Sequence, residues 1–258
     1  MKLFKKFRFK HLRIEKLTRI QILSRILALG AVLCFVGAVL CITVYEKDYK
    51  SSVKSGELTL PYHEHISVIT ENVPVYIFPT DDENITVKYL SDSEVTVEEE
   101  KGRLIIKQEG EIVFSLFSFC QFDYKIEVFL PQKTYRSIVL ATSDAPLYSG
   151  LLDSSVVNIT AKSGYVNIED IRCHSRLTIE TDSAEAQINV SKFSGGELKN
   201  RSGNINLNFT EDIETCVLTG SRCYINGLAV QGGESEAGAH KLKVTTNSGR
   251  VRIFTAMQ

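Results

Sequence analysis

Six short stretches in the second half of the chain share one pattern: an alternating apolar run, a turn containing serine, and a second alternating run. They read SIVLATSDAPLY (137–148), VVNITAKSGYVNI (156–168), RLTIETDSAEAQI (176–188), ELKNRSGNINL (197–207), CVLTGSRCYIN (216–226) and KLKVTTNSGRVRI (241–253). Steps of 20, 20, 19, 19 and 27 residues separate the turn serines, which are Ser143, Ser163, Ser183, Ser202, Ser221 and Ser248. A strand-like unit that recurs at this period is typical of a solenoid.

Apolar residues keep fixed places relative to these serines. The position four residues earlier holds Val139, Ile159, Ile179, Leu198, Val217 and Val244, and the position five residues later holds Ile168, Ile188, Leu207 and Ile253. Because side chains alternate between the two faces of a strand, we expect both sets to point inward. The residues between them should face solvent, as at Asn158, Thr178, Asn167 and Arg252. The pattern predicts a coil that turns once per repeat and stacks on the next through parallel ladders.

Glycine follows the serine in three turns, as Gly164, Gly203 and Gly249. Glycine tolerates the positive φ that a sharp corner between two strands often requires, so we expect that conformation here. Asp144, Ala184 and Arg222 take the same place in the other turns, and those corners should be less regular. We assign a structural role to the turn residues Ser163, Gly164, Ser183, Ser202, Gly203, Ser221, Ser248 and Gly249.

The segment before the repeats is also strand-like. Between Glu57 and Pro131 the chain contains short β-branched runs, separated by Asn, Asp, Gly and Pro. The runs are HISVIT, VPVYIF, NITVKYL, EVTVEEE, RLIIKQ and YKIEVFLP. We therefore predict an all-β ectodomain over residues 57–258, a parallel β-solenoid whose regular repeats run from 135 to 254. The polar stretch EKDYKSSVKSG, residues 46–56, is predicted to be a linker.

The residues 26–45, ILALGAVLCFVGAVLCITVY, carry no charge. As a helix, twenty residues extend about 30 Å, which matches the hydrocarbon thickness of a bilayer. The sequence therefore predicts one transmembrane α-helix. A cleaved signal peptide is the competing interpretation, but its apolar region is usually shorter and ends at a small-residue cleavage motif, which is missing before Glu46.

Residues 1–25 form a basic tail whose single acidic residue is Glu15. Lys and Arg accumulate on the cytoplasmic side of a membrane span. We expect a single-pass protein of the plasma membrane, with this tail in the cytoplasm and the C-terminal domain outside it. The whole chain has 30 basic and 31 acidic residues, which gives no reason to expect nucleic acid as a partner.

The six cysteines fall into two groups. Cys34 and Cys41 lie in the predicted span, where buried small side chains are the default interpretation. In an oxidising compartment the other four can form two disulfides with three alternative connectivities. These four are Cys120, Cys173, Cys216 and Cys223.

No catalytic, cofactor-binding or metal-binding residues are predicted. Enzymes that cleave glycans need paired carboxylates, but the acids of the repeats sit at unrelated offsets from the turn serines. They are Asp144, Asp153, Asp170 and Asp182. His63 and His65 would share one face of a strand, but without a third ligand they do not make a metal site.

Two segments interrupt the pattern. The aromatic run IVFSLFSFCQF, residues 112–122, is expected to cover one end of the solenoid, and an exposed patch for a partner or lipid is the alternative. GGESEAGAH, residues 232–240, accounts for the long final step and is expected to be a surface loop.

The combination of these features resembles the putative-adhesin family of bacterial membrane-anchored β-strand-repeat domains of unknown function. The likeness extends over residues 57–254 and rests on the span, ITENVPVYI (69–77), DYKIEVFLP (123–131) and the repeated Ser-Gly turns. It implies a parallel β-solenoid held at a membrane, in some members beside regulators of envelope stress. The family has no established catalytic residues to transfer to this chain.

Three functions follow as hypotheses. The first is a non-enzymatic, membrane-anchored cell-envelope protein with an adhesin-like binding or envelope-sensing domain, whose partner is a cell-wall polymer or an envelope protein. The second is a regulatory membrane subunit that signals envelope stress to a cytoplasmic partner through residues 1–25. A glycan-active β-helix enzyme ranks third, because the acids do not align.

Overall fold

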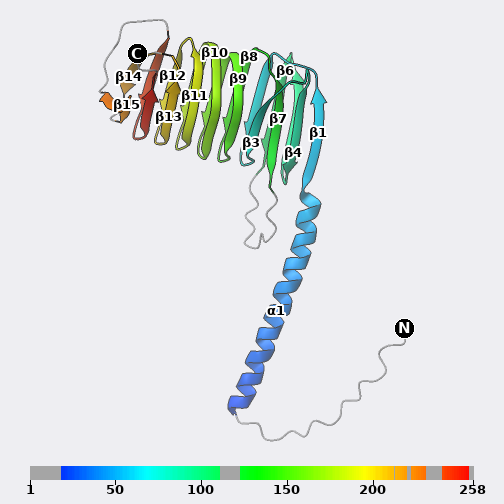
Figure 1. Ribbon diagram of the computed structural model, residues 1–258. Helices are drawn as coiled ribbons and strands as arrows, with labels where there is room; N and C mark the ends of the chain where they lie inside the picture. Colours follow the sequence, from blue (N-terminus) through cyan, green and yellow to red (C-terminus); the bar gives the residue numbers. More distant parts are fainter. Residues whose placement is uncertain (1–18, 111–122, 212, 220–221, 231–239, 256–258) are drawn as a thin grey trace. The chain divides into compact units, whose positions relative to one another are not determined.

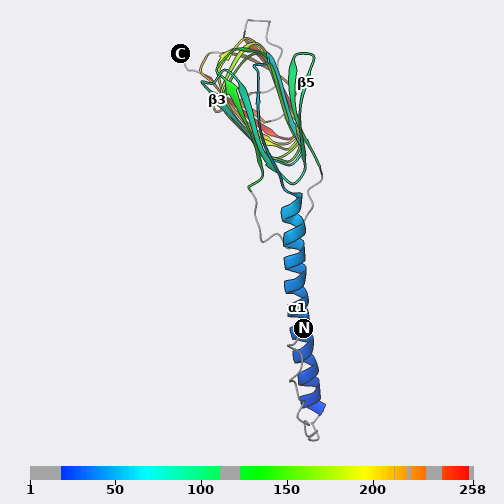
Figure 2. The same cartoon turned by 90° about the vertical axis from the view of Figure 1, so that its right-hand side faces the viewer.

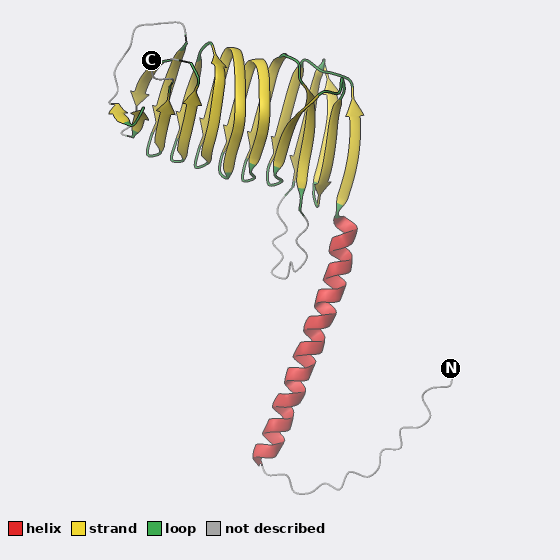
Figure 3. Cartoon of the chain, viewed as in Figure 1, coloured by secondary structure: helices red, strands yellow, loops and turns green. Residues whose placement is uncertain are grey.

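The computed structural model describes the chain except for residues 1–18, 111–122, 212, 220–221, 231–239 and 256–258 (Figure 1). It contains two compact units, Met1–Ser51 and Ser52–Gln258. The helix α1 (Arg19–Ser52) makes up nearly all of the described part of the first unit. The described part of the second unit is built from strands joined by turns and loops, as Figure 3 shows.

From residue 26 to residue 40 the described side chains of α1 are apolar on all sides, and the polar Ser24 and charged Arg25 precede them. Its large apolar side chains are exposed by between 43% (Val39) and 72% (Phe35). Neighbours such as Ile26 and Leu27 point about 100° apart around the helix axis. Among the described residues, no helix combines the length and the apolarity needed to cross a membrane. The predicted span 26–45 lies within α1, and the side chains of its last five residues are outside the described set.

The predicted linker 46–56 does not form. Instead α1 continues to Ser52, and the first strand begins at Lys54. Extending an existing helix costs far less than starting one, because the nucleus is already formed.

The described part of the second unit has eighteen strands. They are β1 (Lys54–Leu60), β2 (His65–Thr70), β3 (Val75–Thr80), β4 (Ile85–Ser91), β5 (Glu94–Glu100), β6 (Arg103–Glu109), β7 (Lys125–Pro131), β8 (Tyr135–Thr142), β9 (Leu147–Ala161), β10 (Tyr165–Thr181), β11 (Glu185–Phe193), β12 (Gly196–Asn200), β13 (Asn204–Phe209), β14 (Glu214–Thr219), β15 (Cys223–Ile225), β16 (Leu228–Val230), β17 (Lys241–Thr246) and β18 (Arg250–Phe254).

The strands pair in two ladders that form the two broad walls of a flattened coil, seen end-on in Figure 2. Ladder A runs β5, β6, β2, β8, β9, β10, β12, β17, β14. Ladder B runs β1, β4, β7, β3, β9, β10, β11, β13, β18, β15, β16. The long strands β9 and β10 take part in both ladders, since their first halves belong to ladder B and their second halves to ladder A.

Most neighbours pair in parallel, as the repeats predict, and the antiparallel pairs are confined to the ends of the stack. They are β1–β4, β4–β7, β5–β6 and β15–β16. Hairpins suit these positions because they cover strand edges that would otherwise pair with other chains. The β15–β16 hairpin turns through Asn226 and Gly227, with φ of 48° and 82°, as the Asn-Gly pair of a type I′ turn requires.

The coils do not stack in the order of the sequence. The arch β17–β18 lies between the arch β12–β13 and the strands β14 and β15, which precede it in the chain. At the other end, β2 lies between β6 and β8, and β3 lies between β7 and β9. We expected each repeat to stack on the one before it, and that prediction is wrong at the C-terminal end, where the last two repeats exchange places.

The space between the ladders holds one continuous apolar core. The predicted inward residues Ile159, Ile179, Leu198 and Val244 are at most 1% exposed. The second set, Ile168, Ile188, Leu207 and Ile253, is fully buried. Val139 is the exception, because Ile138 and Leu140 on either side of it fill the core instead. The side chain of Val217 lies outside the described residues. The all-β coil inferred from the repeats is therefore confirmed, with one repeat shifted by a residue.

Candidate functional site

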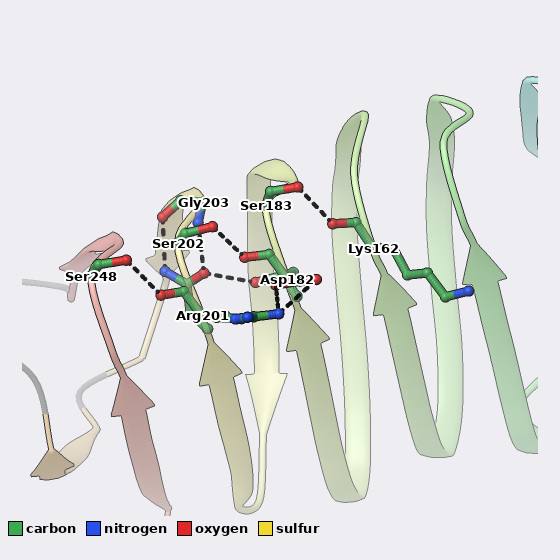
Figure 4. A network of polar contacts seen from close by, with 9 residues as sticks. Lys162, Asp182, Ser183, Arg201, Ser202, Gly203 and Ser248 are labelled. Carbon is green, nitrogen blue, oxygen red and sulfur yellow. Dashed lines mark hydrogen bonds and ion pairs between the residues drawn. The ribbon is translucent and has the colours of Figure 1, made fainter.

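Four of the predicted turn serines, Ser163, Ser183, Ser202 and Ser248, form hydrogen bonds to the neighbouring coil. Figure 4 shows these bonds at Ser183, Ser202 and Ser248. Ser183 donates its amide and its hydroxyl to the carbonyl oxygen of Lys162, over 2.7 and 3.1 Å. Ser248 does the same to Arg201, over 2.8 and 3.2 Å. Because the serine hydroxyl joins a bond that the backbone already makes, it reinforces the corner of the coil.

The first repeat is offset from this column by one residue. The amide of Ser163 donates to the carbonyl oxygen of Ser143, so Ser143 matches Lys162 and not Ser163. Asp144 occupies the place of the serine, and its carboxylate accepts from the hydroxyl of Ser163. Ala145, not Asp144, therefore corresponds to the glycine position. The offset also explains why Val139 points outward.

The three turn glycines are needed for two different reasons. Gly164 has a φ of 85°, as we expected from the turn. Gly203 and Gly249 do not have positive φ, and our prediction was wrong there. At Gly203 a Cβ atom would lie 1.8 Å from the carbonyl oxygen of Ala184, and at Gly249 it would lie 2.3 Å from that of Gly203. Close packing of neighbouring coils, not the backbone angle, excludes a side chain. Ser221 lies outside the described residues.

Two of the four cysteines that could form disulfides have described side chains, and these two are not bonded to each other. Cys173 and Cys223 are free thiols in the core, on strands β10 and β15. Strands β11, β13 and β18 separate them in ladder B, which at about 4.8 Å per strand is too far for a bond. Burial raises the pKa of both thiols, so both favour the protonated form. The side chains of Cys120 and Cys216 are outside the described set.

The acids of the repeats have separate partners. Asp153 lies 2.8 Å from His174, and Asp170 lies 3.4 Å from Arg172. Asp182 pairs with Arg201 at 3.3 Å. His63 lies 3.5 Å from Glu99 on the hairpin strand β5. Among the described residues, no three His, Cys, Asp or Glu side chains gather as metal ligands.

The outer face of ladder A carries charges that neutralise one another. Lys199 contacts Glu180 at 2.7 Å and Arg201 contacts Asp182 at 3.3 Å. Lys243 contacts Glu197 at 3.6 Å. Glu180, Asp182, Lys199 and Arg201 border a shallow depression of about 370 Å³ beside the serine turns. Such exposed pairs contribute little to stability, and they leave few free charges for a ligand.

The outer face of ladder B is built from aromatic and amide side chains. The rings of Tyr76 and Tyr148 stack with centroids 5.0 Å apart and planes within 10°, and Tyr165 continues the row at 6.1 Å. Farther along, the amide of Asn208 donates to Asn189 over 2.7 Å. The sequence did not lead us to this face, because Tyr76 belongs to a segment without the repeat and meets Tyr148 only through the β3–β9 pairing. For this face, the alternation along the strands predicted only that Asn167 and Arg252 point outward.

Comparison with known proteins adds a family and several similar folds. The family model Toastrack DUF4097 matches residues 63–253. No curated protein matches the chain. Among solved structures, a "putative cell adhesion protein" from Clostridium sporogenes covers 79% of this chain and 100% of its own, with 12% identity and a TM-score of 0.40.

Two further structures are similar in coverage. A "putative adhesin" from Bacteroides fragilis shares 14% identity over 79% of this chain and 97% of its own, with a TM-score of 0.35. A "putative lipid binding protein" from Parabacteroides distasonis shares 13% identity over 80% and 97%, also with a TM-score of 0.35. Since the family model spans most of the chain and the repeats carry its resemblance to the putative-adhesin family, this protein belongs to the Toastrack DUF4097 family.

Proposed function

We propose that this protein is anchored in the plasma membrane by α1 and carries its β-coil domain outside the cytoplasm as a non-enzymatic binding scaffold of the cell envelope. One observation carries the anchoring: from residue 26 to residue 40 the exposed surface of α1 is apolar in every direction. A helix on the surface of a soluble protein has a polar face, whereas one that is apolar all round needs an apolar environment on all sides.

The charge pattern next to α1 supports the direction of insertion. Residues 1–25 contain basic side chains and a single acid, Glu15. Such a tail stays on the cytoplasmic side of a span. The coil domain, residues 52–258, then lies on the opposite side of the membrane.

A binding role agrees with the surface of the domain better than catalysis does. The repeat acids Asp153, Asp170 and Asp182 each form an ion pair with a different basic residue, so they do not act together as a carboxylate pair. The stacked coils instead present two long walls. A scaffold of this kind is suited to a partner that extends along it.

The topology can be tested with single cysteines and a membrane-impermeant maleimide on intact cells. Ser248 is exposed in the coil domain, and Lys5 lies in the basic tail. We expect Ser248→Cys to be labelled in intact cells and Lys5→Cys only after the cells are opened, with both variants in the membrane fraction. The parent chain, with its buried Cys173 and Cys223, sets the background. Recovery of the chain in the soluble fraction, or labelling of Lys5→Cys alone in intact cells, would refute the proposal.

A further inference from the structure

One outward row of side chains crosses ladder B from strand to strand. Register pairs Tyr148 with Asn167, Asn167 with Gln187, Gln187 with Asn206, Asn206 with Arg252, and Arg252 with Tyr224. Neighbouring strands are about 4.8 Å apart, so these five steps extend about 24 Å. The row begins with an aromatic ring, continues with three amides, and ends with a guanidinium beside a second aromatic ring.

A second row runs next to it and ends in the same way. Tyr165 pairs with Glu185 across β10 and β11, and Asn204 pairs with Arg250 across β13 and β18. Arg222 follows at the end of this row, where its carbonyl oxygen accepts from the amide of Val251. The exposed Arg250 and Arg252 border the same depression as Tyr224, and the exposed Arg222 lies two residues before Tyr224 in the chain.

The surface is hollowed along these two rows. A depression of about 250 Å³ is bordered by Tyr165, Glu185, Asn206 and both Arg250 and Arg252. A second depression of about 340 Å³ is bordered by the same two arginines together with Tyr224 and Phe254. The two hollows adjoin at these arginines, and we call them together the arginine groove.

The charges of the arginine groove are not neutralised from within the described part of the chain. Neither Arg250 nor Arg252 has an acid of the described residues within ion-pair distance, and the acid bordering the groove, Glu185, accepts from the amide of Asn204 over 3.4 Å. Ladder A shows the opposite arrangement, where Lys199 and Lys243 contact Glu180 and Glu197. Among the residues that the structure describes, basic side chains on the wall of ladder A are paired, whereas Arg250 and Arg252 on the wall of ladder B have no acidic partner.

We propose that the arginine groove binds an acidic polysaccharide that lies across the strands of ladder B. Apolar ring faces of the sugars would pack on Tyr165 and Tyr224, while hydroxyl groups bond the amides of Gln187 and Asn206. Arg250 and Arg252 would hold carboxylate groups, because a guanidinium binds a carboxylate through two parallel hydrogen bonds. This inference rests on the proposed function and names the ligand class of the binding scaffold.

The chemistry of the groove favours a glycan over the other anionic polymers. A lipid surface is recognised by many basic and apolar side chains together, whereas the middle of this groove is made of amides. Nucleic acid is bound through a larger surplus of positive charge than three guanidiniums beside Glu185 provide. An extended chain with spaced carboxylates matches both the amides and the separate cations.

The test measures binding of polygalacturonate, the carboxylated probe, to the purified full-length chain in a neutral detergent. Neutral dextran, anionic phosphatidylglycerol vesicles and single-stranded DNA serve as competing ligands. We expect polygalacturonate to bind more tightly than the others, and Arg250→Gln/Arg252→Gln to weaken it at least about tenfold. The matched control Lys199→Gln/Lys243→Gln changes net charge equally on ladder A and should change the affinity less than twofold.

Three results would overturn the inference: stronger binding to vesicles or DNA, equal binding of dextran, or equal losses in both double variants. Circular dichroism of each variant verifies that the β structure is intact, and Arg252→Lys should restore only part of the affinity if bidentate contacts matter. The binding assay uses purified protein, so it does not depend on where the cell places the chain. A failure here with correct maleimide labelling in cells would reject the ligand class and leave the anchored scaffold in place.

Discussion

The amide and the hydroxyl of Ser202 both donate to the carbonyl oxygen of Asp182, over 2.7 and 2.9 Å. This pair of hydrogen bonds to one acceptor joins two neighbouring coils, and the bonded residues are 20 positions apart in the sequence. It recurs at Ser163, Ser183 and Ser248. Serine thus recurs in the sequence because the same hydrogen-bonded contact between neighbouring coils recurs in the structure.

Replacing Ser202 with alanine removes the hydroxyl but keeps the amide bond. We expect Ser202→Ala to lower the free energy of unfolding by about 1 kcal/mol, the usual contribution of a single hydrogen bond. Ser137→Ala on β8 is the control, because among the described residues its hydroxyl has no hydrogen-bond partner. Denaturant unfolding measures both variants. Equal effects at the two sites would contradict the role given to the turn serine.

Gly203 tests whether coil spacing or backbone angle requires glycine. The Cβ atom in Gly203→Ala would meet the carbonyl oxygen of Ala184, so we expect a loss of at least about 3 kcal/mol. Gly227 has a φ of 82° but open space around it, and Gly227→Ala should cost only about 1 kcal/mol. Thermal unfolding of the two variants compares them. A smaller loss at Gly203 than at Gly227 would show that the coils are not packed this closely.

Gln108 is a buried polar side chain at the N-terminal end of the stack. Its Oε1 accepts from the amides of Glu71 and Asn72, and its Nε2 donates to Asn72 and Ser93. Gln108→Leu leaves these groups without partners inside the protein, and we expect a loss of about 2–4 kcal/mol. Gln187→Leu, at an exposed position of β11, should change stability by less than about 0.5 kcal/mol. Denaturant titration distinguishes the two, and a neutral Gln108→Leu would refute the network.

Tyr135 is expected to lower the stability of the folded domain at alkaline pH. Burial, together with the nearby Tyr62, raises the pKa of its phenol well above the usual 10, and the hydroxyl donates to the carbonyl oxygen of Pro131 over 3.0 Å. The folded state therefore holds this proton more tightly than the unfolded state. Stability should be constant below pH of about 10 and fall as the pH rises further.

The variant Tyr135→Phe separates these two effects. It should lose about 1 kcal/mol at neutral pH, because the hydrogen bond to Pro131 is absent, but decline less steeply above pH of about 10. Tyr148→Phe on the outer face is the matched control for removing one phenol hydroxyl. Unfolding measured from pH 7 to pH 11 gives, for each protein, the slope of the free energy of unfolding against pH. A parent and a Tyr135→Phe variant with the same alkaline slope would contradict the assignment.

Regular periodicity made much of the fold predictable. Ile159, Ile179 and Leu198 recur at a constant distance before a serine, and local alternation alone is enough to place them inward. The shift at Ser143 was not visible, because the serine sits one residue before the place that Asp144 fills. The offset becomes visible only when the residues paired between neighbouring coils are known, and one sequence does not give that pairing.

The order of the coils and the arginine groove depend on contacts between distant segments. No local feature of the sequence indicates that β17 pairs with both β12 and β14. The step of 27 residues before Ser248 shows only that the repeat is interrupted there. For the same reason the sequence did not bring Arg252 beside both Asn206 and Tyr224. Long-range strand pairing, not propensity, decides both features.

The insertion of β18 between β13 and β15 is the claim on which the arginine groove depends. Two variants test it by oxidative crosslinking followed by mass spectrometry of the linked peptides: Asn206→Cys/Arg252→Cys, which are direct partners, and Asn206→Cys/Tyr224→Cys, which lie two strands apart. The account predicts a crosslink in the first variant and none in the second, because two strand spacings of about 4.8 Å exceed the reach of a disulfide. A crosslink between residues 206 and 224, with none between 206 and 252, would mean that the coils stack in sequence order and would contradict it.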